Sequence, residues 1–137
     1  MTETFAPEIN GVAMTLGQLV NGLLARGCTV NVFRPRQSRN EQPRLNGRYH
    51  EHLYAGMQMP MYRDLRFGFP AAGRLRSAWR KQRPDAVYVA TEGPLGLSAV
   101  NVAAKLGIPT LSGFHTNFHT YSRHYKLRLL EPLILGY

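Results

Sequence analysis

Three short polar turns carry the residues whose chemistry is most informative in this sequence. Gly11 ends one turn and opens an apolar helical pattern, Glu92 lies in residues 91–94, and His115 follows a buried-strand pattern. Backbone N–H groups at a helix N-terminus attract anionic oxygens, and a glycine there lets a ligand approach closely. A carboxylate can accept a hydrogen bond from a sugar hydroxyl or act as a base. The turns are therefore candidates for contact with a phosphorylated or hydroxylated ligand.

Each of these residues also has a purely structural interpretation. Gly11 can be an ordinary turn glycine, Glu92 can cap the helix that follows it, and the ring of His115 can hydrogen-bond a neighbouring loop. His115, His119 and His124 lack the spacing of HExxH or Cys/His sites, so we expect no metal. The sequence also lacks the dinucleotide, P-loop and hydrolase signatures GxGxxG, GxxxxGK[ST] and GxSxG.

Length and composition indicate one globular domain. The chain has 137 residues, of which 44% are hydrophobic, enough to bury a core. Cys28 is the single cysteine, which excludes an internal disulfide. No apolar run reaches the roughly 18 residues that a membrane span needs, and the first residues do not resemble a signal peptide. These features favour a cytosolic protein.

The net charge of +9 is the unusual property of this composition, and 14 of the 17 basic residues are arginine. Such a balance predicts an anionic partner, either nucleic acid, a phosphorylated ligand or an anionic lipid surface, or else simply a basic surface. Residues 63–69 mix arginine with phenylalanine, a combination that suits lipid headgroups or single-stranded nucleic acid, although the phenylalanines can equally be core residues. No nucleic-acid recognition motif accompanies the charge, so we expect no nucleic-acid partner.

Hydrophobic periodicity predicts alternating strands and helices around these turns. Residues 2–5 resemble the end of a strand, residues 35–48 a mobile surface loop, and residues 56–70, with their prolines and glycines, an irregular segment. Strands are predicted at 29–33, 85–90 and 108–114, with a short one at 49–55. Helices are predicted at 12–24, 71–82, 94–106, 117–125 and 127–137.

This order predicts an α/β fold, a Rossmann-like doubly wound sheet whose parallel strands are joined by right-handed crossovers. In such sheets the turns after the carboxyl ends of the strands line the binding crevice. The prediction brings together the polar residues and the glycine of three turns, namely Glu8, Asn10, Gly11, Glu92, His115 and Asn117.

Five motifs in order give the sequence a family resemblance. TETFAPEINGV at 2–12 resembles the N-terminal signature of retaining glycosyltransferases of family 4, which have the GT-B fold. The motifs RPRQ (34–37), LRFG (65–68), TEGPLG (91–96) and FHTNF (114–118) follow. The combination is similar to membrane-associated α-mannosyltransferases and glycolipid synthases that use GDP-mannose or UDP-sugars, and the resemblance covers nearly the whole chain.

The resemblance implies the N-terminal half of a GT-B fold, truncated at both ends. Residues 1–137 would be an incomplete acceptor-side domain, without the C-terminal domain that binds the nucleotide sugar. We therefore expect the fragment alone to be inactive and marginally stable. The complete enzyme would transfer a hexose, with mannose as the expected sugar, from a nucleotide sugar to a lipid-linked or glycan acceptor with retention. The alternative is a non-catalytic module that binds an anionic lipid or glycan.

The resemblance also assigns roles to individual residues. His115 would be the catalytic residue beside the transferred sugar, positioning and stabilising it while the donor phosphate takes the acceptor proton. No cofactor is implied beyond the donor, GDP-mannose or a UDP-sugar, and the expected location is cytoplasmic, peripheral at the inner face of the cell membrane. Asn10, Gly11 and Glu92 would bind the donor, and the acceptor would contact Tyr62, Arg66, Tyr121, Arg123 and Lys126.

Overall fold

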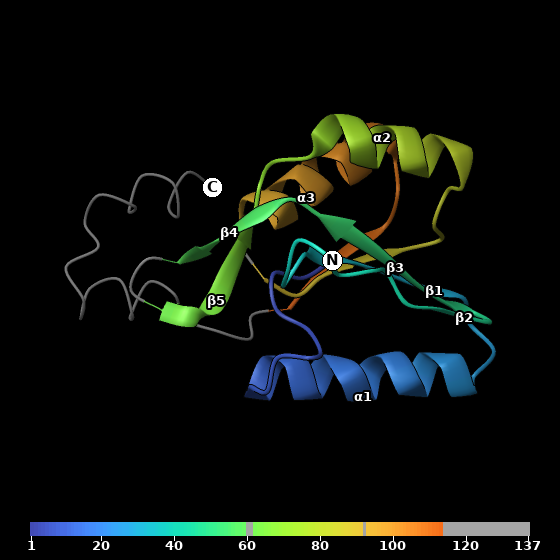
Figure 1. Cartoon of the computed structure of the whole chain (residues 1–137). Coiled ribbons are helices and arrows are strands. Elements are labelled where there is room, and N and C mark those ends of the chain that lie inside the picture. Colours follow the sequence, from blue (N-terminus) through green and yellow to red (C-terminus); the bar gives the residue numbers. More distant parts are fainter. Residues whose placement is uncertain (60–61, 92, 114–137) are drawn as a thin grey trace.

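The computed structural model describes residues 1–59, 62–91 and 93–113 (Figure 1). These residues form an α/β fold in which helix α1 lies on one side of the strands and helices α2 and α3 lie together on the other. The helices are α1 (Gly11–Ala25), α2 (Ala72–Lys81) and α3 (Pro94–Leu106). The strands are β1 (Val30–Pro35), β2 (Leu45–Asn46), β3 (Tyr49–Tyr54), β4 (Gly56–Met59), β5 (Tyr62–Gly68), β6 (Val87–Val89) and β7 (Thr110–Ser112).

The ends of the helices follow from local sequence chemistry. Asn10 caps α1, because its side-chain oxygen accepts the backbone N–H of Ala13 at 2.8 Å. Pro94 starts α3, where its missing N–H leaves no intrahelical bond unmade. Gly27 and Gly107 follow α1 and α3 with φ of 81° and 63°, a left-handed conformation that side chains disfavour. Both glycines end the helices where the sequence predicted.

The parallel strands pair in two groups that the first residues of the chain connect. Strand β1 runs parallel to β3, with β2 antiparallel on the outer side of β3, and β6 runs parallel to β7. Thr2 N–H donates to the Phe33 carbonyl at 3.1 Å, while Ala90 N–H donates to the Met1 carbonyl at 2.9 Å. Residues 1–2 thus lie between β1 and β6, in the position of a central parallel strand. This arrangement confirms the Rossmann-like fold class.

Each side of the strands has its own buried cluster. Phe5, Leu16, Val32 and Ala90 pack between α1 and one face. The larger cluster packs the other face against α2 and α3, and its members are Phe33, Tyr54, Leu75, Trp79, Val87, Val89, Leu95, Ala99, Val102, Ala103 and Ile108. Helices therefore cover both faces, as the near-continuous apolar runs of parallel strands require.

One sequence prediction about the middle of the chain is wrong. Residues 56–70 are not irregular, because β4 and β5 form an antiparallel pair running from Gly56 opposite Gly68, with a register shift between Gln58 and Met59. The cause is backbone pairing, which leaves no apolar period in the sequence. Residues 36–44 form a largely exposed loop, as the sequence predicted, and an ion pair from β1 and a hydrogen bond to β3 hold part of it.

Candidate functional site

The candidate site lies at the edge where the parallel strands end. The turn at residues 6–10 leads into α1, and the loop from residue 36 follows β1. Residues 90 and 91 follow β6, and Gly93 precedes α3. The carboxyl ends of parallel strands share one edge of a sheet, and ligands of open α/β folds bind there. The peptide bond between Ala6 and Pro7 in the first of these turns is cis.

Glu8 connects the first turn to the loop after β1. Its carboxylate accepts hydrogen bonds from the hydroxyl of Thr4, the Asn10 amide at 3.3 Å and the amide of Gln37. The Asn10 amide also donates to the Thr4 hydroxyl at 2.7 Å. These contacts orient the Asn10 side chain, so its oxygen faces the first turn of α1 as a cap.

Gly11 is the first residue of α1 and has open space around it. A Cβ atom placed on Gly11 would meet no atom within 4 Å in the described structure. Its φ is not in the left-handed region, so the backbone itself tolerates a side chain there. The glycine is therefore not required by packing or by dihedral angle. The first-turn N–H groups of α1 other than that of Ala13, which Asn10 caps, can donate to an anionic oxygen.

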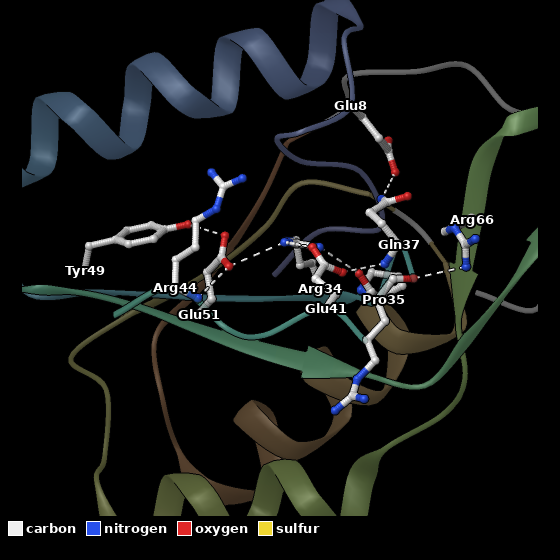
Figure 2. Close-up of polar contacts among 10 residues, drawn as sticks. Glu8, Arg34, Pro35, Gln37, Glu41, Arg44, Tyr49, Glu51 and Arg66 are labelled. Atoms are coloured by element: carbon white, nitrogen blue, oxygen red, sulfur yellow. Dashed lines mark hydrogen bonds and ion pairs between the residues drawn. The ribbon is translucent and has the colours of Figure 1, made fainter. Parts of the chain in front are cut away.

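A buried ion-pair network supports the loop after β1 (Figure 2). The Arg34 guanidinium is 1% exposed and contacts Glu41 at 2.6 Å and Glu51 at 3.4 Å. Glu51 also accepts the Tyr49 hydroxyl at 2.7 Å and the Arg44 N–H at 3.0 Å. Partial burial opposes ionisation of Glu41, but its bonds from Arg34 and the backbone N–H of residue 37 hold its pKa below the usual value.

Arg66 reaches from β5 toward the same loop. Its guanidinium donates to the backbone carbonyl of Arg36 at 3.1 Å, and Figure 2 shows it beside the Gln37–Glu8 contact. Arg66 is partly exposed, which leaves the remaining guanidinium donors of this predicted acceptor residue available to an anionic or hydroxylated group. Tyr62 begins the same strand, and its side chain lies outside the description.

Glu3 fills the N-terminus of α3. Its carboxylate accepts hydrogen bonds from the Gly68 N–H at the end of β5 and from the Leu95 N–H at 3.2 Å. Its own backbone N–H donates to the Thr91 hydroxyl at 2.6 Å. The two helix N-termini at this edge therefore differ, because that of α3 already holds a carboxylate and that of α1 does not.

The predicted site residues divide into two groups. Asn10, Gly11 and Arg66 lie at or near the carboxyl edge of the strands, but no interaction that we describe joins them directly. The others lie outside the described residues, Tyr62 by its side chain only, and their placement stays a prediction; they are Tyr62, Glu92, His115, Tyr121, Arg123 and Lys126.

Sequence reasoning missed Glu3 as a site residue, named Glu8 only as a neighbour and did not consider the side chain of Gln37. The position of Glu8 in the turn before a helix was a usable signal, and so was that of Gln37 directly after the first buried strand. The sequence contained no such signal for Glu3, because a carboxylate in a strand-like segment is ordinarily expected to face solvent.

A cavity of about 420 Å³ lies elsewhere, at the opposite ends of β1 and β6. Its lining includes Met1, residues of α1, and Cys28, Asp85 and Trp79. Within the described residues, no group of three or more His, Cys, Asp or Glu side chains is arranged to hold a metal ion. No helix in that part of the chain is long and apolar enough to cross a membrane.

The parallel strands, the helices on both faces and the polar turns at the carboxyl edge define a Rossmann-like α/β domain. The sequence profile of Glycosyltransferase Family 4 matches residues 9–137, so the chain belongs to that family.

Curated relatives agree with this membership. The chain is 27% identical over 129 residues to a GDP-mannose-dependent alpha-mannosyltransferase of Mycolicibacterium smegmatis and 28% identical over 129 residues to one of Mycobacterium tuberculosis. Each match covers 93% of this chain and 34% of the relative. It is 26% identical to an alpha-monoglucosyldiacylglycerol synthase of Streptococcus pneumoniae, over 99% of this chain and 30% of that protein. The chain thus spans about a third of the length of these relatives, and no solved structure matches it significantly.

Proposed function

We propose that this chain is the acceptor-side, N-terminal domain of a retaining hexosyltransferase of the GT-B fold. The complete enzyme would move a hexose, in the first instance mannose, from GDP-mannose or a UDP-sugar to a lipid-linked or glycan hydroxyl. Family membership supports the reaction class, and the names of the relatives support mannose and a glycolipid product. A second domain opposite the crevice would hold the nucleotide.

The observation that carries the proposal is the open N-terminus of α1. Gly11 borders empty space, Asn10 is oriented by Glu8, and the competing helix N-terminus of α3 is filled by Glu3. Of these two N-termini, that of α1 holds no carboxylate. Its backbone N–H groups and dipole favour binding of the phosphate groups of a nucleotide sugar. Asn10 is then held ready to contact the donor while it caps the helix.

The proposed chemistry needs little beyond this positioning. In a retaining transfer without a protein nucleophile, the donor phosphate accepts the proton of the attacking hydroxyl as the bond from the sugar to that phosphate breaks. The protein contributes charge stabilisation and orientation. Arg66 is the described candidate for orienting the acceptor, and His115 is the proposed catalytic residue beside the sugar.

The test is transfer by the complete encoded enzyme with Gly11→Val and, separately, His115→Ala. We expect each to lower kcat/KM at least tenfold, about 1.4 kcal/mol of transition-state stabilisation. Gly17→Ala is the matched control, because Gly17 is also in α1 and a Cβ there also meets no atom within 4 Å. If both site variants stay within about threefold of wild type, under about 1 kcal/mol, the site assignment is wrong.

We further propose that the enzyme works at the inner face of the cell membrane. Support comes from the net charge and from α2, whose last turn carries the exposed basic residues Arg80 and Lys81. Anionic lipid surfaces attract such residues, and salt screens the attraction. Co-sedimentation with anionic vesicles but not with neutral ones is expected, and equal binding to both would contradict the membrane part. Vesicle binding without any transfer would favour a non-catalytic lipid- or glycan-binding module.

A further inference from the structure

Glu3 is a buried carboxylate shared by two elements that bear predicted site residues. The residue is 6% exposed. Its carboxylate accepts the N–H of Gly68, the last residue of β5, and the N–H of Leu95 in the first turn of α3. Strand β5 carries Arg66, and the turn before α3 carries Glu92. One side chain therefore joins the predicted acceptor side of the site to the predicted donor side.

Glycines make room for this carboxylate. A Cβ atom on Gly93 would overlap the Glu3 side chain, and one on Gly68 would overlap the Leu95 side chain at 2.7 Å and lie 3.0 Å from the Glu3 carboxylate oxygen. Neither glycine has a positive φ, so the space, and not the backbone angle, is what requires a residue without a side chain. Backbone atoms of both elements consequently pack directly against the carboxylate and fix its position.

The carboxylate is unfavourable as a simple core residue. Burial raises the pKa of Glu3 to about 7, against the N–H bonds from Gly68, Gly96 and Leu95, which lower it. The charged group acting on it among the described residues is the Met1 amine. Burial lowers the pKa of that amine to about 5, so it is mostly neutral where Glu3 titrates. Glu3 is therefore held by backbone N–H groups and the α3 dipole, not by an ion pair.

We propose that Glu3 is a positioning residue of the transfer site, whose carboxylate sets β5 and its Arg66 relative to the turn that enters α3. This inference rests on the proposed function and deepens it. A carboxylate suits the role because both of its oxygens accept backbone N–H groups, whereas an amide would turn an NH₂ group toward some of these donors. Glu3 acts through these backbone groups and need not touch either substrate.

The experiment is Glu3→Gln in the complete encoded enzyme, with acceptor and donor KM and kcat measured from about pH 6 to about pH 8.5. We expect acceptor KM to rise about tenfold above neutral pH while donor KM stays within about twofold. In wild type, acceptor KM should change with a midpoint near neutrality, and this pH dependence should be absent from the variant. Asp85→Asn, an exposed carboxylate before β6, is the control and should leave both profiles unchanged.

A second measurement needs no variant and no activity. In the wild-type chain, the amide resonances of Gly68 and Leu95 should titrate together with one midpoint near neutral pH, because one carboxylate binds both. Separate midpoints, or movement of one amide alone, would overturn the coupling even if the enzyme is active. An unchanged pH profile in a folded Glu3→Gln enzyme would overturn the positioning role. If the wild-type enzyme transferred no hexose, the proposed function would be wrong. The amide titration would still test whether one carboxylate couples Gly68 to Leu95.

Discussion

The buried carboxylates of Glu51 and Glu3 are stabilised by different partners. Glu51 has a side chain with no exposure, and it is neutralised by the guanidinium of Arg34 and bonded by the Tyr49 hydroxyl. Glu3 accepts backbone N–H groups and has no ion pair among the described residues, so desolvation dominates and raises its pKa to about 7. The first arrangement places a counter-charge beside the buried carboxylate, whereas the second leaves a carboxyl whose pKa lies near neutrality.

The raised pKa of Glu3 makes stability depend on pH with a definite sign. Below about pH 4.5 the carboxyl is protonated in both the folded and the unfolded chain. As pH rises toward 7, the unfolded chain ionises first, so the stability contributed by Glu3 is lost through this window and then levels off. The shift from 4.5 to about 7 corresponds to at most about 3 kcal/mol.

Urea unfolding of wild type and Glu3→Gln at about pH 5 and about pH 8 measures this effect. The free energy of unfolding of wild type, relative to the variant, should fall between the two pH values, because glutamine cannot ionise. All other titrating groups are common to both proteins and cancel in the difference. A difference that stays constant with pH would show that Glu3 does not titrate in this range.

At the scale of elements, the loop after β1 depends on charges that the strands bury. Arg34 of β1 joins Glu41 in the loop to Glu51 of β3, and the backbone N–H of Arg44 donates to the same Glu51 carboxylate. Within the described structure, the Arg34 Nε atom is buried without a hydrogen-bond partner. The network is therefore a local constraint on the loop more than a net gain in stability.

Arg34→Met should destabilise the domain by about 3–5 kcal/mol, because it leaves the Glu51 carboxylate buried without its counter-charge. The double variant Arg34→Met with Glu51→Leu should recover a large part of that loss. Arg39→Met is the control, since Arg39 is an exposed arginine of the same loop. The urea midpoints of wild type and the three variants measure these effects. Equal loss of stability in the single and double variants would contradict the ion-pair account.

The elements that the sequence predicted well are those whose stability comes from apolar faces and caps. Helix α1 was recognisable from its leucine and valine period and Gly27, and α3 from Pro94 and Gly107, because those residues act locally. The β4–β5 pair was missed because its pairing rests on backbone hydrogen bonds and glycines at close approach, as where a Cβ on Gly56 would overlap the Phe67 carbonyl.

The candidate site was predictable only in part, for the same reason. Gly11 was predicted from the sequence to open a helix, whereas the capping of that helix by Asn10 was found only in the structure. The burial of Glu3 was not predictable, because its partners Gly68 and Leu95 are 65 and 92 residues away in sequence. Contacts of that range depend on how the strands assemble, which a local pattern does not specify.

At the scale of the whole molecule, residues 1–2 connect two groups of parallel strands. The Met1 nitrogen donates to the Tyr88 carbonyl at 2.7 Å, and Thr2 N–H donates to the Phe33 carbonyl of β1. The cluster against α2 and α3 also spans both groups, since it contains Phe33 of β1 and Val87 of β6. Backbone pairing and side-chain packing therefore join the two groups side by side.

Thr2→Pro removes the N–H that bonds to β1 and should lower the free energy of unfolding by about 1–3 kcal/mol. Thr2→Val is the matched control, because it keeps the N–H and loses the hydroxyl that donates to the Thr4 carbonyl at 2.6 Å. Chemical denaturation monitored by Trp79 fluorescence compares them. Equal destabilisation by the two substitutions would place the effect in the hydroxyl and not in the backbone bond.

The glycines that surround Glu3 also restrict how this family can vary. A side chain at position 93 needs the volume that the Glu3 side chain occupies, and one at position 68 would overlap Leu95 and come close to the Glu3 carboxylate. Among relatives, a larger residue at position 93 should therefore accompany a shorter residue at position 3, and a glutamate at position 3 should accompany glycine. We therefore expect substitutions at positions 3, 68 and 93 to be correlated among relatives, although these positions are far apart in sequence.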